Sequence, residues 1–154
     1  MNRFKTLLFS ILMPIILAAG NFVSEEASVI NHTDSITLAG TLTTPADSHP
    51  RSALVMATGS GAQYRDEEIF SHKPFKVIAE YLAGNGYAVL RMDDRGTAHS
   101  EGDFTSATTD DFVTDIAAGL EILAERFPNM QKGVIRHSEG GTIAIKTASR
   151  NRLC

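Results

Sequence analysis

One serine stands where a nucleophile could be held, at Ser138 in the run His137-Ser138-Glu139-Gly140-Gly141. The run follows a short apolar stretch, Gly133–Ile135, and precedes a helical pattern, which predicts a strand-to-helix turn at the serine. Such a turn lifts the hydroxyl clear of a sheet and aims a helix N-terminus at the reacting oxygen. Gly140 supplies the small residue that the turn needs two positions after the serine. An ordinary helix cap is the alternative, because serine is a good N-cap residue.

A second, glycine-rich segment could complete a site that stabilises an oxyanion. Gly59-Ser60-Gly61 directly follows the apolar run Ala53–Thr58, and glycines allow the backbone to turn an N–H group toward a reacting oxygen. By position, the N–H groups of Ser60 and Glu139 are the predicted pair of donors. A nucleotide-binding loop is the competing interpretation, but the acidic run Asp66-Glu67-Glu68 just beyond would repel a pyrophosphate.

The elements that must position these residues alternate along the chain. Residues 27–31 and 36–43 predict an antiparallel hairpin. Apolar runs then predict three buried strands, Ala53–Thr58, Tyr87–Met92 and Gly133–Ile135. Helices are expected from Pro74, with Phe75, Ile78, Ala79 and Leu82 on its apolar face, over Asp110–Phe127, and after Ser138. This alternation predicts right-handed crossovers and a parallel sheet.

Composition is consistent with one small globular domain. The 154 residues carry a formal net charge of −4 and 43% hydrophobic residues, so the chain has no basic footprint for nucleic acid. The single cysteine, Cys154, cannot form an internal disulfide.

The first residues predict a signal peptide. Arg3 and Lys5 precede an apolar core at residues 7–17, and Ala18-Ala19-Gly20 offers small residues for cleavage. We therefore expect a signal peptide at residues 1–20 and a secreted or periplasmic protein beginning at residue 21. The apolar core is short for a membrane span, and none is expected after cleavage.

Several motifs occur together, in an order that matches a known family. They are Gly59 to Glu67, His72 to Phe75, Asp93 to Gly96 with Ser100 and Gly102 to Phe104, and His137 to Gly141. Over most of residues 53–150 the chain resembles bacterial α/β-hydrolases of the carboxylesterase or serine-aminopeptidase-like group. The resemblance implies an α/β-hydrolase fold, a Ser–Asp/Glu–His triad, and hydrolysis of small-molecule carboxylic esters through an acyl-enzyme, with no metal or organic cofactor.

The resemblance also implies roles for individual residues. Ser138 matches the nucleophile, Ser60 and Glu139 match the oxyanion positions, and further positions match structural turns near the site: Gly59, Gly61, Asp94, Arg95, Gly96 and Gly140. Arg95 either ties loops together through carbonyls or carboxylates or is a solvated surface arginine.

Two features depart from the family. Arg136 stands where a glycine is expected, after a strand that looks one residue short, and its side chain should clash where helix meets strand. In this fold the triad acid and histidine follow the serine, but Glu139 is the sole acidic residue after Ser138, and no histidine follows it. The earlier histidines at positions 32, 49, 72 and 99 fall in predicted loops, and the side chain of His137 diverges from that of its neighbour.

We therefore expect the N-terminal half of an α/β-hydrolase, a partial domain over residues 21–154. It comprises a leading antiparallel hairpin and then a parallel β-α-β-α-β-α unit, and it is incomplete. Weak or absent activity is expected, since a serine without a base is a poor nucleophile. A non-catalytic truncated relic or binding fragment is one alternative, and a peptidase or thioesterase on the same fold is another.

Overall fold

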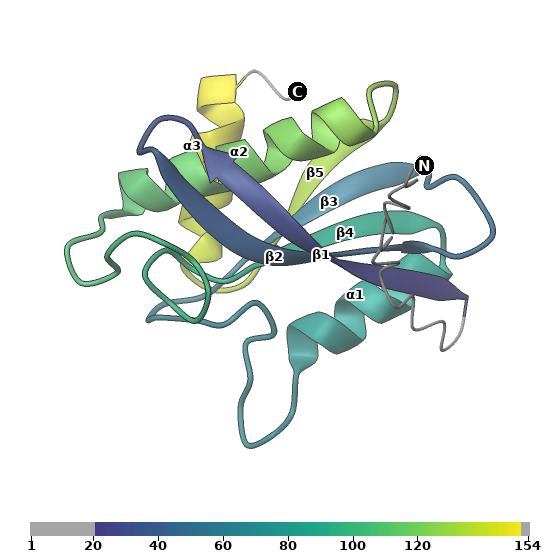
Figure 1. Ribbon diagram of the computed structural model, residues 1–154, viewed down its shortest axis with the longest axis horizontal. Helices are drawn as coiled ribbons and strands as arrows, with labels where there is room; N and C mark the ends of the chain where they lie inside the picture. The colour runs from purple at the N-terminus through teal and green to yellow at the C-terminus, as the bar shows by residue number, and fades with distance from the viewer. Residues whose placement is uncertain (1–20, 152–154) are drawn as a thin grey trace, which may run out of the picture.

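A computed structural model describes residues 21–151, in which a five-stranded mixed sheet carries helices on both faces (Figure 1). The strands are β1 (Phe22–Asn31), β2 (Ile36–Pro45), β3 (Ser52–Ala57), β4 (Tyr87–Met92) and β5 (Gln131–Arg136), and the helices are α1 (Pro74–Gly84), α2 (Thr109–Arg126) and α3 (Gly140–Asn151). The predicted signal peptide and Cys154 lie outside the described residues.

Strand pairing follows the order β1-β2-β4-β3-β5. β1 and β2 form the predicted antiparallel hairpin, and β2 pairs antiparallel with β4. β3 runs parallel to both β4 and β5, which confirms the predicted parallel unit. The connection from β4 through α2 to β5 crosses over β3, so β3 lies between its two parallel partners. The loops that follow β3, β4 and β5 therefore start from the same edge of the sheet.

Three strands are longer than the sequence predicted: β2 runs to Pro45 rather than residue 43, and two others differ more. β1 begins at Phe22 rather than residue 27, and β5 spans Gln131–Arg136 rather than three residues. Both are edge strands whose additional residues are partly or fully exposed, so polar side chains there hide the strand pattern. β5 therefore has six residues, as β3 and β4 have, and the expectation of a shortened strand was wrong.

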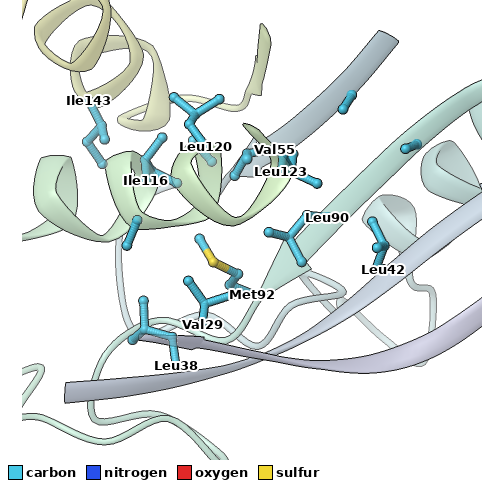
Figure 2. Packing of buried hydrophobic residues seen from close by; sticks show 14 of the residues in the cluster. Val29, Leu38, Leu42, Val55, Leu90, Met92, Ile116, Leu120, Leu123 and Ile143 are labelled. Atoms are coloured by element: carbon cyan, nitrogen blue, oxygen red, sulfur yellow. The ribbon is translucent and has the colours of Figure 1, made fainter. Parts of the chain in front are cut away.

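The core lies in two layers on opposite faces of the sheet. The larger layer packs the sheet against α2 and α3, with Val55 and Leu90 from the strands meeting Leu120, Leu123 and Ile143 from the helices (Figure 2). The smaller layer packs Met56 and Val89 against Phe75 and Ala79 of α1. Neighbouring residues of β3 and β4 thus point to opposite layers, which is why both strands read as continuous apolar runs.

α1 begins at the predicted residue, and α2 begins one residue before the predicted Asp110. Pro74 opens α1, and Thr108 caps α2 through a reciprocal capping box with Asp111. The apolar face of α1 is narrower than expected, because Phe75 and Ala79 are buried whereas Ile78 remains 40% exposed. Among residues 21–151, no helix combines the length and apolarity needed to cross a membrane.

Candidate active site

Ser138 lies in a tight turn between the end of β5 and the start of α3. It is exposed, and its φ of 48° places it in the left-handed region, which residues with a side chain rarely adopt. The backbone N–H of His137 donates to the carbonyl of Ala57 at the end of β3, 3.1 Å away. The turn is therefore anchored to the neighbouring parallel strand, and the serine hydroxyl lies beyond the end of the sheet.

Gly140 allows this turn to sit against the sheet. A Cβ at position 140 would lie 2.5 Å from the carbonyl oxygen of Ala57 and 2.7 Å from that of Thr58, distances that no side chain tolerates. The first turn of α3 consequently packs on the backbone that leads into the glycine-rich loop.

Arg136 does not disrupt the turn, and the predicted clash was wrong. Its side chain is exposed, and its Nη1 passes 3.1 Å from the place that a Cβ on Gly141 would occupy. Because Gly141 has no side chain, the guanidinium lies over the start of α3 instead of entering the junction between strand and helix.

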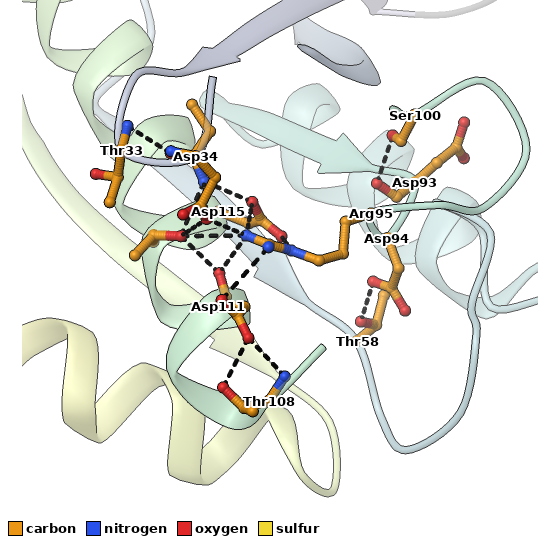
Figure 3. Close-up of polar contacts among 12 residues, drawn as sticks. Thr33, Asp34, Thr58, Asp93, Asp94, Arg95, Ser100, Thr108, Asp111 and Asp115 are labelled. Atoms are coloured by element: carbon orange, nitrogen blue, oxygen red, sulfur yellow. Dashed lines mark hydrogen bonds and ion pairs between the residues drawn. The ribbon is translucent and has the colours of Figure 1, made fainter. Parts of the chain in front are cut away.

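The glycine-rich loop after β3 is held by Asp94. The carboxylate of Asp94 accepts a hydrogen bond from the Thr58 hydroxyl at 2.7 Å, drawn in Figure 3, and another from the Gln63 N–H at 2.9 Å. Burial raises the pKa of Asp94 to about 6. Asp94 thus fixes both ends of the loop that contains Ser60, and the same loop carries Gly61 at a φ of 92°.

Neither of the two predicted oxyanion donors has a hydrogen-bond acceptor among the described residues. Across residues 21–151, the backbone N–H groups of Ser60 and Glu139 donate no hydrogen bond to a protein acceptor. The carbonyl of Ser60 accepts from the Gln63 side chain at 3.1 Å, which further orders the loop. Neither of these N–H groups is therefore used in a hydrogen bond within the described residues.

Glu67 belongs to this site, although no motif in the sequence marks it as a site residue. Its Oε1 accepts from the Gly59 N–H at 2.5 Å, and its Oε2 lies 2.9 Å from His137 Nδ1. The sequence showed Glu67 only as part of an acidic run, and no local pattern signals that one member of the run turns inward. A single carboxylate thereby links the glycine-rich loop to the residue that precedes Ser138.

Arg95 is buried and ties loops together, which confirms the first of the two interpretations. Its Nε and Nη2 donate to the two oxygens of Asp115 at 2.8 and 2.9 Å, and Nη2 also donates to Asp34 at 2.7 Å (Figure 3). The network joins the β1–β2 turn to α2. Gly96 follows at a φ of 68°. The backbone of Asp103 and Phe104 fills the space that a Cβ at position 96 would occupy.

The remaining histidines are exposed in loops, as expected: His32, His49, His72 and His99. His99 lines an open groove of about 800 Å³ beside Arg65 and Asp93, and none of the turn residues around Ser138 lines that groove. Within the described part of the chain, no group of three His, Cys, Asp or Glu side chains could hold a metal ion.

Comparison with known proteins agrees with this geometry. Residues 71–153 match the family model described as serine aminopeptidase, S33. The chain is 32% identical over 115 residues to Esterase EstD of Thermotoga maritima, covering 75% of this chain and 28% of EstD.

Solved structures share the fold. An esterase of Pyrococcus furiosus, Pf2001, superposes with a TM-score of 0.69 at 25% identity, over 85% of this chain and 48% of its own. A hypothetical protein from Pseudomonas aeruginosa superposes with a TM-score of 0.71 at 18% identity, over 98% of this chain and 46% of its own. The chain thus spans about half the length of these structures.

Proposed function

The chain belongs to the serine aminopeptidase S33 family of α/β-hydrolases, and we propose that it supplies the nucleophile and the oxyanion donors of a carboxylic ester hydrolase. The reaction would proceed through an acyl-enzyme on Ser138. The observation that carries the proposal is the left-handed turn at Ser138, anchored to β3 and set beside a loop with a free N–H group.

The turn suits a nucleophile for steric reasons. Ser138 is exposed at the carboxyl end of the sheet, so an acyl carbon can reach its hydroxyl from solvent. A left-handed non-glycine residue is energetically unfavourable and persists where the surrounding structure enforces it, as His137 and Gly140 do here.

The donors suit the charge that develops during attack. When the Ser138 oxygen adds to an ester carbonyl, the carbonyl oxygen becomes an oxyanion, which preorganised N–H groups stabilise. The Ser60 and Glu139 N–H groups come from the loop after β3 and from the start of α3, so the dipole of α3 adds to the same stabilisation.

A base is needed to take the serine proton, and the 154-residue sequence has no histidine after Ser138. We therefore expect little turnover from residues 21–154, with at most the roughly 10³–10⁴-fold acceleration over water that binding and an oxyanion hole give without a complete triad.

Chemical rescue tests the proposal under these conditions. Residues 21–154 and the Ser138→Ala variant are incubated with p-nitrophenyl acetate, with and without imidazole as an external base, and acetylated peptides are identified by mass spectrometry. We expect imidazole to accelerate acetylation of Ser138 in the parent chain, while the alanine variant shows only the background seen at lysines. Acetylation confined to lysines in both proteins would contradict the proposal.

The related proteins point to two substrate classes, esters and peptides. EstD and Pf2001 are esterases, whereas the family model describes an aminopeptidase, so a peptidase on the same fold is the second candidate. Matched aminoacyl p-nitrophenyl ester and p-nitroanilide probes, both with imidazole, separate the two. The ester is intrinsically more reactive than the anilide, so the Ser138→Ala variant measures the background rate with each probe. A preference for the ester that exceeds this background difference supports the esterase.

Secretion is part of the same proposal and rests on residues 1–20. Expression of the full chain in a bacterial host, followed by N-terminal sequencing of the periplasmic fraction, tests it. We expect the mature chain to begin at Asn21. Retention of the intact N-terminus in the cytoplasm would contradict it.

A further inference from the structure

The carboxylate of Glu67 joins two segments that are distant in the sequence. Oε1 accepts from the Gly59 N–H at 2.5 Å, and Oε2 pairs with His137 Nδ1 at 2.9 Å. Gly59 immediately precedes Ser60, and His137 immediately precedes Ser138. Each anchor of the carboxylate is therefore one residue before a group that the proposed reaction uses.

The surroundings fix the Glu67 end of this bridge. The Glu67 side chain is 6% exposed, and its backbone adopts a φ of 47°, closed by a hydrogen bond from its N–H to the Tyr64 carbonyl at 2.9 Å. A Cβ on Gly59 would lie 3.0 Å from His137 Nδ1. The absence of a side chain at Gly59 thus lets the loop approach the imidazole closely enough for one carboxylate to bind both.

We propose that Glu67 is a positioning residue that sets the spacing between the two oxyanion donors. The proposal rests on the function proposed above, because it assigns the donors to Ser60 and Glu139. Without the bridge, the glycine-rich loop loses its direct tie to the turn at Ser138, and the Ser60 N–H moves relative to the Glu139 N–H.

The bridge also defines the part that His137 plays. Nδ1 of His137 lies 2.9 Å from Glu67 Oε2, so the carboxylate holds the ring by its Nδ1 side and leaves Nε2 facing away from the bridge. In this arrangement His137 contributes a hydrogen-bond donor at a fixed place, and it does not need to exchange a proton with Ser138. An asparagine, whose Nδ2 can occupy the Nδ1 position, should replace it.

The bridge itself is tested without any reaction. In ¹⁵N-labelled residues 21–154, we expect a slowly exchanging Gly59 amide and a His137 ring protonated at Nδ1. Glu67→Leu should accelerate Gly59 amide exchange at least tenfold, because leucine has no acceptor for the Gly59 N–H. Glu68→Leu is the matched control, since Glu68 is exposed and pairs with Lys73, and it should leave both signals unchanged. Equal Gly59 exchange in the parent chain and in Glu67→Leu would overturn the proposal.

The effect on positioning is read from imidazole-assisted acetylation of Ser138. Glu67→Leu and His137→Leu should slow the maximal acetylation rate by about tenfold or more with a smaller change in the half-saturating ester concentration. His137→Asn should retain a rate near that of the parent, as should Glu68→Leu.

The outcomes separate the two proposals. A His137→Asn variant as slow as His137→Leu would overturn the positioning role, because it would mean that the imidazole acts through Nε2. If the parent chain is not acetylated at Ser138, the proposed function fails, while the Gly59 exchange data still decide whether Glu67 forms the bridge. Circular dichroism of each variant confirms that a slow rate is not loss of fold.

Discussion

Asp94 and Arg95 are neighbours in one turn, yet they enter opposite electrostatic environments. Arg95 points toward the β1–β2 turn and α2, where carboxylates surround its guanidinium. Asp94 points toward the glycine-rich loop, where a hydroxyl and a backbone N–H are its partners. Figure 3 shows the two side chains diverging from the shared backbone.

The Arg95 side is charge-compensated. Burial lowers the pKa of Arg95, but its hydrogen bonds to Asp115 and Asp34 outweigh that effect and raise the pKa above its ordinary value. The same hydrogen bond from Arg95 lowers the pKa of Asp34. Each charge therefore stabilises the other, and the network holds the hairpin against α2.

The Asp94 side lacks such compensation. Asp94 and Glu67 both lie next to the glycine-rich loop, and their strongest contacts include neutral donors from Thr58, Gln63 and Gly59. Burial and the nearby carboxylates raise the pKa of Asp94. The difference teaches that charges that hold the scaffold are paired within it, whereas those beside the candidate site orient backbone groups at a cost in stability.

Removing Arg95 should produce the largest effect. Arg95→Met leaves Asp115, which is 5% exposed, buried without its cation, and we expect the free energy of unfolding to fall by about 3–5 kcal/mol. Urea denaturation measures the loss. Arg126→Ala is the control, because Arg126 pairs with Glu25 at the exposed surface, and it should cost about 0–1 kcal/mol. Similar losses in the two variants would remove the contrast between the regions.

Neutralising Asp94 should change how stability depends on pH. Because the folded pKa of about 6 exceeds the ordinary 3.8, the folded state binds more protons between these values, and stability falls as pH rises through this window. The contribution of Asp94 to this fall is roughly 3 kcal/mol. Asp94→Asn should lack it, so the stability difference between variant and parent should shift in favour of the variant from pH 4 to 7. Parallel pH profiles would contradict the raised pKa.

The turn at Ser138 can be tested through its two glycines. Gly140→Ala forces a Cβ against two carbonyl oxygens and should reduce stability by about 1–3 kcal/mol. Gly141→Ala meets the far end of the Arg136 side chain, which can move, so its loss should stay below about 1 kcal/mol. The urea midpoints of the two variants give the comparison. An equal loss of stability in both would show that the carbonyl oxygens beside Gly140 do not cause a specific clash.

The smallest effect is expected at Ser138 itself. Ser138→Gly relieves the left-handed backbone and should stabilise the chain by about 1 kcal/mol relative to Ser138→Ala, which removes the hydroxyl but keeps the strain. Equal urea midpoints for the two variants would show that the turn is not strained.

The sequence predicted the parallel unit because Ala53–Thr58 and Tyr87–Met92 are apolar on both faces, and it predicted the turn at Ser138 because Gly140 follows at the required spacing. The predicted clash of Arg136 was wrong, because its flexible side chain lies over Gly141 and so stays outside the junction between strand and helix. The Glu67 bridge was missed because the inward turn of that carboxylate arises from loop geometry and from a partner far along the chain.

The attachments of the glycine-rich loop limit how its length can vary. Gly59, Gln63, Arg65 and Glu67 each make a backbone or carboxylate contact with a fixed partner, whether the end of β4, the turn before Ser138 or the loop itself. An inserted or deleted residue between Gly59 and Glu67 would shift at least one of these attachments out of register, whereas the side chains of Ser60 and Tyr64 face solvent. Evolution can therefore change residue identity at those two positions more readily than it can change the number of residues in the segment.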